Sequence, residues 1–474
     1  MIDLTTLTLT KARTALDAKE FSALDLARAY ISEIEKKNKD LNIYLEVFSD
    51  IEEQAKKADE IIAVGKATMM TGIPISVKDN ILIKGRKVSA ASKMLENYTA
   101  TYNATVIEKL MKEGVVFLGR TNMDEFAMGS STENSAFGRT KNPHDQDRVP
   151  GGSSGGAAAS VAANLALVAL GSDTGGSIRQ PASFCGLVGL KPTYGAVSRH
   201  GLMAMASSLD QIGPLTKNTE DAEILFNAIR GKDRYDSTSI DISEIKKEEN
   251  KKLRIGVPRD FIGEGVDKDV MDNFTASLEA LKKADCEIVD VSLPNLKYSL
   301  SVYYVIQPAE VSSNLARFDG VKYGLHVDGK DLLEDYLLTR QEGFGKETRR
   351  RIMLGTYVLS SGYYDAYYYK AHAIRSLIIK DFENSFKDVD VILTPTSPMP
   401  AFKAGEKVDD PLAMYLADIF TVSANIVTLP AISVPSGFAE RGGKNLPLGI
   451  QFTAPYGRED RLFTVGKLFE STRS

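Results

Sequence analysis

Two segments rich in glycine and serine contain the residues best suited to catalysis. The first is Val-Pro-Gly-Gly-Ser-Ser-Gly-Gly at 149–156, and the second is Gly-Ser-Asp-Thr-Gly-Gly-Ser-Ile-Arg at 171–179. Segments of this composition usually form flexible linkers or tight turns. Both of these segments lie between stretches with the pattern of buried structure, so we expect turns of defined shape. Ser153 and Ser177 are the hydroxyl groups that such turns would present.

The second segment predicts a turn that binds an anion. An apolar run at 165–170 leads into it and helix-forming residues follow, which places Ser177 at a strand-to-helix turn. Glycines let the main chain approach a ligand closely, and successive amides at a helix N-terminus can point at one spot. We therefore predict an oxyanion hole made by the backbone amides of Thr174, Gly175, Gly176 and Ser177.

A serine hydroxyl needs a base to become a nucleophile, and histidine is the usual one. None of the four histidines stands in a Gly-x-Ser-x-Gly frame or a similar motif; they are His144, His200, His326 and His372. A lysine made neutral by burial is the alternative. Most lysines are solvated, but Lys78 directly follows the apolar run at 73–77. Open α/β sheets place their sites at the carboxyl ends of strands, so Lys78 is the predicted base.

The composition is that of a large folded protein that does not hold nucleic acid by charge alone. The 474 residues are 43% hydrophobic and 26% charged, with a net charge of -5. Because binding to phosphates needs an excess of Lys and Arg, we expect another protein chain to grip any RNA. Two cysteines, Cys185 and Cys286, exclude a disulfide scaffold or a four-cysteine metal site and fit a reducing compartment. No signal peptide or membrane span is predicted, so a cytoplasmic location is expected.

The elements that must position these groups are alternating helices and buried strands. Strands are predicted at 73–77, 115–118, 165–170, 255–257, 389–393, 432–434 and 448–452. Helices are predicted at 22–37, where Ser22 and Asp25 form a capping box, and at 105–113, 219–229 and 268–283. This order predicts an α/β fold: a single large domain over 1–474, with a central mixed, mostly parallel sheet covered by helices on both faces. The charged stretch 244–254 is the best linker candidate, and we interpret it as a solvated loop within that domain.

The two segments together resemble the amidase signature family. The resemblance rests on Gly-Gly-Ser-Ser-Gly-Gly at 151–156, on Gly-Ser-Asp-Thr-Gly-Gly-Ser-Ile-Arg-Gln-Pro at 171–181, and on the spacing of their serines. In that family a Ser-cis-Ser-Lys triad operates. The resemblance therefore implies that Ser177 is the nucleophile, that Ser153 is the bridging serine on a cis peptide, and that Lys78 is the base. It also implies the amidase signature fold.

Three further stretches resemble the tRNA-dependent amidotransferase branch of the family, at 119–133, 207–214 and 317–324. The likeness runs from near residue 20 to near residue 460. It implies hydrolysis of glutamine, with ammonia passed on for amidation of Glu-tRNA(Gln) and in many organisms Asp-tRNA(Asn). The implied partners are the tRNA-binding, ATP-using B subunit and the small C subunit of the amidotransferase. ATP and Mg are then expected at the partner, with no cofactor and no metal site in this chain.

The same resemblance implies a pocket for the α-amino and α-carboxylate groups of glutamine. By resemblance Arg351 and Asp418 hold these groups, with Tyr303 nearby and Ser130 in the same pocket. A zwitterionic amino acid needs one fixed cation and one fixed anion, which agrees with this assignment. The choice within the arginine run at 349–351 and between Tyr303 and its neighbour Tyr304 stays open.

Other interpretations have less support from the sequence. Asp173 and Arg179 flank the nucleophile and are interpreted as a structural pair that holds its loop. The alternative function is a stand-alone amidase that acts on a small amide. A catalytically silent scaffold would have lost the nucleophile or the base, and both are present. The nearest match to a nucleotide-binding P-loop, at 324–331, ends in Asp331 where magnesium binding needs Ser or Thr.

Overall fold

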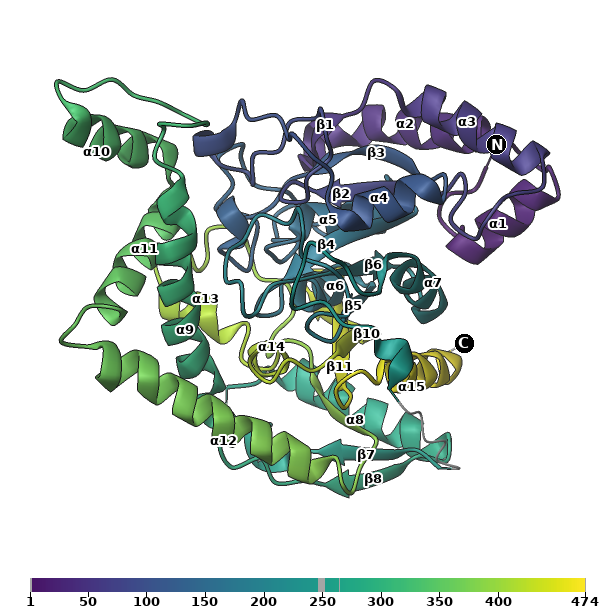
Figure 1. The fold of residues 1–474 in the computed structure, drawn as a ribbon. Coiled ribbons are helices and arrows are strands. Elements are labelled where there is room, and N and C mark those ends of the chain that lie inside the picture. Colours follow the sequence, from purple (N-terminus) through teal and green to yellow (C-terminus); the bar gives the residue numbers. More distant parts are fainter. Residues whose placement is uncertain (1, 246–251, 264, 474) are drawn as a thin grey trace.

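Eleven strands form one continuous sheet in the computed structural model, which describes residues 2–245, 252–263 and 265–473 (Figure 1). The strands are β1 (Tyr44–Val47), β2 (Pro74–Lys78), β3 (Val116–Thr121), β4 (Val168–Asp173), β5 (Val188–Lys191), β6 (Gln211–Thr216), β7 (Arg254–Val257), β8 (Glu287–Asp290), β9 (Val391–Pro395), β10 (Ala431–Arg441) and β11 (Lys444–Thr453). Their order across the sheet is β1-β3-β2-β4-β6-β5-β10-β11-β9-β7-β8. Because this sheet joins strands from both ends of the chain, the predicted single large α/β domain is confirmed.

All seven predicted strands are present, as β2, β3, β4, β7, β9, β10 and β11. Strands β1, β5, β6 and β8 were not predicted. In β5 and β6 the reason is their glycine and proline, which usually mark turns rather than buried strands. Gly213 in β6 is needed for close packing, since a Cβ there would lie 2.1 Å from the carbonyl oxygen of Leu190 in β5.

The sheet is mixed, as predicted, but the prediction that it is mostly parallel is wrong. Every strand pair from β4 across the middle of the sheet to β9 is antiparallel, and parallel pairs occur only toward its two ends. One cause is the hairpin between β10 and β11, which turns at Gly442 and Gly443 with φ of +60° and +76°. Strands joined by so short a turn must run antiparallel. These two strands were predicted, but the hairpin that joins them was not.

Fifteen α-helices surround the sheet in the described part of the chain. They are α1 (Leu9–Asp17), α2 (Ala23–Leu41), α3 (Ile51–Ala63), α4 (Thr105–Lys112), α5 (Gly155–Ala162), α6 (Arg179–Cys185), α7 (Thr219–Ile229), α8 (Lys268–Lys283), α9 (Ser299–Asn314), α10 (Leu332–Gly343), α11 (Lys346–Val358), α12 (Lys370–Ser385), α13 (Pro411–Leu416), α14 (Val422–Ile426) and α15 (Glu459–Ser471). The four predicted helices correspond to α2, α4, α7 and α8. The predicted capping box is also present, with Asp25 N donating to Ser22 Oγ and Ser22 N donating to Asp25 Oδ2.

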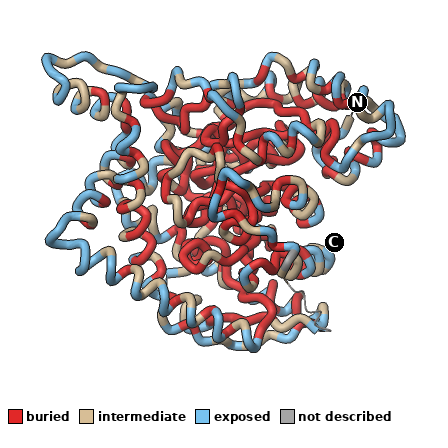
Figure 2. Tube along the Cα trace, viewed as in Figure 1, coloured by how far each residue is buried: buried red, intermediate tan, exposed pale blue. Residues whose placement is uncertain are grey.

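Helices cover both faces of the sheet, as predicted. Val168 and Leu170 of β4 belong to the large core that also contains apolar residues of α2, α3, α7 and α15. Ala169 between them belongs to a separate core with α5 and α6. Successive residues of a strand point to opposite faces, so these two cores lie on opposite sides of β4. The sheet between them is buried along most of its length (Figure 2).

A layer of helices stands beside the sheet and supplies part of the site. Helix α9 packs against α11, α12 and α14 (Figure 1). An apolar core with Ile306, Ile378 and Val422 lies between α9, α12 and α14. No helix among the described residues is both long enough and apolar enough to cross a bilayer. The charged stretch 244–254, predicted to be a solvated loop, lies mostly within 246–251, outside the described residues.

Candidate active site

Lys78 is the last residue of β2 and is fully buried, as predicted from its place after an apolar run. Its Nζ donates to Ser153 Oγ at 2.8 Å, to Ser154 Oγ at 2.8 Å, and to Ser172 Oγ at 2.9 Å. A fourth contact, at 3.2 Å, reaches the carbonyl oxygen of Ser172. Burial lowers the pKa of Lys78 to about 7, although the charges of Asp124 and other buried aspartates oppose this shift. A lysine in this environment can become the neutral amine that accepts a proton.

Ser153 lies in a turn of unusual main-chain geometry. The peptide bond between Gly152 and Ser153 is cis, as the family resemblance implies. A Cβ on Gly152 would lie 2.2 Å from Asp124 Oδ2, so only glycine fits there. Asp124 holds the turn, since its N–H donates to the carbonyl oxygen of Ser153 and its carboxylate accepts the N–H of Thr132. These contacts fix Ser153 Oγ beside the lysine.

Ser177 lies between β4 and α6, at the predicted strand-to-helix turn. Its carbonyl oxygen accepts the N–H of Ser154 at 3.1 Å, which joins the two glycine-serine segments. In the described part of the chain no hydrogen bond uses Ser177 Oγ, and the residue is 8% exposed. The hydroxyl is therefore available to an incoming carbonyl carbon.

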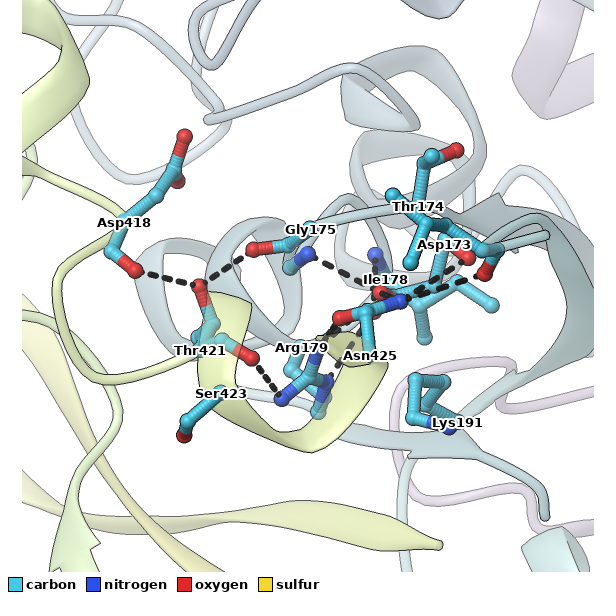
Figure 3. A network of polar contacts seen from close by, with 12 residues as sticks. Asp173, Thr174, Gly175, Ile178, Arg179, Lys191, Asp418, Thr421, Ser423 and Asn425 are labelled. Atoms are coloured by element: carbon cyan, nitrogen blue, oxygen red, sulfur yellow. Dashed lines mark hydrogen bonds and ion pairs between the residues drawn. The ribbon is translucent and has the colours of Figure 1, made fainter. Parts of the chain in front are cut away.

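Asp173 and Arg179 hold the turn as a buried pair. Arg179 Nη2 lies 2.9 Å from Asp173 Oδ1, and both side chains are fully buried. Arg179 donates further to Asn425 Oδ1 and to the carbonyl oxygen of Thr421 (Figure 3). It also donates to Gln451 Oε1. Burial alone would raise the pKa of Asp173, but the charge and hydrogen bonds of Arg179, together with Lys191 and Asn425, outweigh it and lower that pKa to about 2. The predicted structural pair is present, and its contacts extend to both β11 and α14.

The prediction of a four-amide oxyanion hole needs one correction. Gly176 N donates to Asp173 Oδ1 at 2.9 Å, so this amide is occupied inside the turn and does not face a substrate. The prediction counted main-chain amides alone and left out the Asp173 side chain, which accepts one of them. No described residue accepts the amides of Thr174, Gly175 and Ser177, which leaves three donors for an oxyanion.

Asp418 lies close to this turn although it is far away in sequence. Its carboxylate accepts a hydrogen bond from Ser130 Oγ, so the structure brings two of the predicted substrate residues together. Thr421 Oγ1 joins the segment to the turn, because it contacts both the carbonyl oxygen of Gly175 at 2.7 Å and that of Asp418 at 3.1 Å (Figure 3). Burial raises the pKa of Asp418 to about 7, while Ser130 and Arg351 oppose the shift.

Arg351 is the buried member of the arginine run. It is 4% exposed, whereas Arg349 is exposed and Arg350 is partly buried against Glu347. Arg351 Nε donates to Glu347 Oε1 at 2.8 Å and Nη1 donates to Gln307 Oε1 at 3.2 Å. The geometry thus favours Arg351 within the run, as the sequence analysis assigned it.

The two neighbouring tyrosines have different surroundings. Tyr303 packs on the nucleophile turn, since a Cβ on Gly175 would lie 2.6 Å from its Cζ. Tyr304 stacks on Tyr415 with ring centroids 3.9 Å apart, and the guanidinium of Arg351 lies over both rings. Tyr303 is therefore closer to the reacting groups, and Tyr304 is closer to the arginine.

A narrow cleft leads from the surface to this arginine. It is lined by Gly129, Ser131, Glu347, Arg351, Tyr415 and residues of α13. The histidines lie elsewhere: His144 Nε2 contacts the carbonyl oxygen of Cys185, and His200 stacks on Tyr235. Among the described contacts, Lys78 hydrogen-bonds to the serine hydroxyls of the site, and no histidine side chain does.

Several residues of the site were not predicted from the sequence. Ser154 and Ser172 stand inside the two segments it had identified, and both contact Lys78. Asp124 lies in a stretch that was noted only for its resemblance. Asp210 accepts Thr174 Oγ1 at 2.7 Å and so holds the other end of the turn. The serine-rich composition was a usable signal for the first two. Both aspartates lie in stretches noted for their resemblance, at 119–133 and 207–214, but no local pattern distinguished them there.

The fold and the lysine-serine cluster define an amide-hydrolysing class of protein, and the comparisons agree. The amidase family profile matches residues 25–463, and the chain belongs to that family. Among its relatives, the A subunit of the glutamyl-tRNA(Gln) amidotransferase of Thermoanaerobacter pseudethanolicus is 54% identical, with 99% of this chain and 97% of that protein aligned. The protein of the same name from Nitrosococcus oceani is 50% identical over 98% of this chain and 96% of that one.

A solved structure gives the same result. The crystal structure of the glutamyl-tRNA(Gln) amidotransferase A subunit from Thermotoga maritima superimposes with a TM-score of 0.82 at 40% identity. The alignment covers 99% of this chain and 96% of that one. The predicted amidase signature fold is therefore confirmed.

Proposed function

We propose that this chain is the glutaminase subunit of a tRNA-dependent amidotransferase. It hydrolyses glutamine to glutamate and ammonia, and the ammonia converts Glu-tRNA(Gln) to Gln-tRNA(Gln), with Asp-tRNA(Asn) as a second acceptor. The names of the relatives support this role. The observation that carries the chemistry is the Lys78 amine, buried among the hydroxyls of Ser153, Ser154 and Ser172.

The proposed reaction uses Ser177, Ser153 and Lys78 as nucleophile, bridge and base. Ser177 Oγ attacks the carboxamide carbon of glutamine while its proton passes to Ser153, and the proton of Ser153 passes to Lys78. The amides of Thr174, Gly175 and Ser177 are suited to stabilise the oxyanion. Return of the proton to the amide nitrogen releases ammonia and leaves a glutamyl ester on Ser177. Water then hydrolyses that ester by the same proton path.

Recognition of the substrate is assigned to two buried charges. Arg351 would bind the α-carboxylate of glutamine and Asp418 the α-ammonium, with Ser130 orienting the carboxylate of Asp418 and Tyr303 lining the pocket. Glutamine would approach Arg351 through the cleft beside Tyr415. A simple amide carries neither an α-carboxylate nor an α-ammonium group. Arg351 and Asp418 therefore favour an amino acid substrate over a simple amide.

The partners and cofactors belong to this proposal as well. A tRNA-binding, ATP-using B subunit and a small C subunit would accompany the chain, ATP and Mg would bind to the partner, and the assembly would act in the cytoplasm. The acidic composition supports a division of labour, because this chain has no excess of basic residues for tRNA.

The test is to measure glutamine hydrolysis and Gln-tRNA formation with the purified chain and with the reconstituted complex, given ATP and Glu-tRNA(Gln). We expect full glutaminase activity and amidated tRNA only in the complex. If the chain alone hydrolyses glutamine at the rate of the complex, and partners change nothing, a stand-alone amidase replaces this proposal.

A further inference from the structure

Glu125 is a buried carboxylate that the proposed reaction does not use. It is 3% exposed and directly follows Asp124, the residue that holds the cis-peptide turn of Ser153. Burial raises the pKa of Glu125, and the hydrogen bonds it accepts oppose that shift. A buried carboxylate is costly unless polar groups surround it, so the residues that donate to Glu125 indicate what it stabilises.

Glu125 binds the first turn of α11. Its Oε2 accepts the N–H of Gly345, the residue before the helix, at 2.8 Å and Thr348 Oγ1 at 2.6 Å. A Cβ on Gly345 would lie 2.6 Å from Oε2, so the helix approaches this closely only with glycine there. A negative charge also suits a helix N-terminus, where the amides point outward. The carboxylate therefore fixes where α11 begins.

The position of this turn determines the position of Arg351. Thr348 and Arg351 are three residues apart and lie on the same face of α11. Both are buried, at 1% and 4% exposure. If the first turn moves, the guanidinium moves with it, away from Gln307 and from the neighbourhood of Asp418. Glu125 is therefore linked to the substrate-binding arginine through one helical turn.

The other oxygen of Glu125 binds a turn that follows β2. Oε1 accepts Ser92 Oγ at 2.5 Å, and Ser92 ends a turn whose amides at Ser89 and Ala91 donate to Asp79. Asp79 is the residue next to Lys78. Glu125 thus stands between the segment after the catalytic lysine and the helix of Arg351, while its neighbour Asp124 holds the serine turn.

We propose that Glu125 is a positioning residue that fixes α11 and so places Arg351 for the α-carboxylate of glutamine. The inference rests on the proposed function, because it takes Arg351 as the carboxylate-binding residue. It predicts a defect that depends on the substrate: binding of glutamine weakens, and cleavage of an amide without an α-carboxylate does not change.

The experiment compares Glu125→Ala with the wild-type full chain in the reconstituted complex, using glutamine and a simple primary amide. We expect KM for glutamine to rise about tenfold or more, with kcat within about threefold, and kcat/KM for the simple amide to stay unchanged. Glu125→Gln should restore most of the loss. Its carbonyl oxygen can accept from Gly345 and Thr348, and its amide can donate to Ser92 Oγ, which can donate to the carbonyl oxygen of Gly343.

Two further variants separate positioning from general loss of stability. Asp221→Ala is the matched control, because Asp221 is a fully buried carboxylate that accepts the amides of Leu9 and Thr10 at the start of α1, away from the site. It should lower the melting temperature without changing KM. Thr348→Val removes one donor to Glu125 and should raise KM for glutamine by about threefold. This variant decides the question if Glu125→Ala does not fold.

The outcomes are distinct. Equal loss of activity on both substrates, or an unchanged KM for glutamine in Glu125→Ala and Thr348→Val, would overturn the role of Glu125 and leave the proposed function intact. A wild-type complex that cleaves the simple amide but not glutamine would overturn the proposed function itself, and the inference with it.

Discussion

Lys78 Nζ lies 2.8 Å from Ser153 Oγ, and every acceptor it contacts among the described residues is a serine oxygen. A buried ammonium normally pairs with a carboxylate. Here the aspartates act on it only from a distance, and burial lowers its pKa to about 7. A lysine held in this way can change its charge near neutral pH, which is what a general base requires.

Lys78→Arg should be nearly as inactive as Lys78→Ala in glutamine hydrolysis, with kcat reduced by about a hundredfold or more. A guanidinium stays charged and cannot accept the proton of a serine. Steady-state kinetics of the two variants check this. An arginine variant that kept a substantial part of the activity would make Lys78 an electrostatic helper rather than the base.

The pH dependence of the wild-type activity should reflect the titration of Lys78. Only the neutral amine is a base, and with a pKa of about 7 it becomes protonated as the pH falls. We therefore expect kcat, measured at saturating glutamine, to be highest above pH 7 and to decline about tenfold for each unit below it. Initial rates between pH 5.5 and 9 measure this, with a coupled assay for glutamate.

Ser177→Ala should abolish glutamine hydrolysis and leave ammonia-dependent amidation of tRNA by the complex intact, because only the source of ammonia is lost. During wild-type turnover, mass spectrometry should find a glutamyl ester on Ser177. Ser154→Ala is an informative comparison, because it removes one contact of Lys78 but no nucleophile. A trapped acyl group on any residue other than Ser177 would contradict the assignment.

Asp418→Asn should raise KM for glutamine by an amount equivalent to about 2 to 5 kcal/mol, since the α-ammonium would lose its charged partner. The carboxylate must be ionised to pair, and with a pKa of about 7 it is increasingly protonated below that pH. KM for glutamine should therefore rise as the pH falls below 7 in the wild type. This rise should be absent in Asp418→Asn, and the parameters for an amide without an α-amino group should be similar in both.

Arg179→Met should destabilise the chain by about 3 to 5 kcal/mol, because it leaves Asp173 charged and buried without its partner. The pKa of Asp173 is lowered to about 2, so the pair stabilises the fold at pH above the usual carboxyl range, and this contribution is lost as the pH falls toward 2.

Urea unfolding at pH 7 measures this loss, and Arg441→Met is the control. Arg441 pairs with Asp267 and Asp269 at a partly exposed position, where we expect a cost of less than about 1 kcal/mol. Equal losses of unfolding free energy in the two variants would show that the buried pair stabilises the fold no more than the partly exposed one.

The sequence by itself determined the local parts of this site. The apolar run before Lys78 predicted a buried strand ending in a lysine, and β2 ends there. The order of strand, glycine-rich turn and helix around Ser177 could also be predicted, because glycine content and apolar periodicity are features of a few neighbouring residues. The sequence therefore identified the base, both serines and the buried pair of Asp173 and Arg179 as candidates.

Only the tertiary structure decided how these parts meet. Ser153 and Ser172 are 75 and 94 residues from Lys78. Ser172 meets the lysine because β4 lies beside β2 in the sheet, and Ser153 meets it because Asp124 and Ser177 hold its turn. The antiparallel middle of the sheet, the use of Gly176 N by Asp173, and the burial of Arg351 rather than Arg349 depend on which side chains pack together. Local propensity carries no information about such neighbours, because they are set by packing between segments that are distant along the chain.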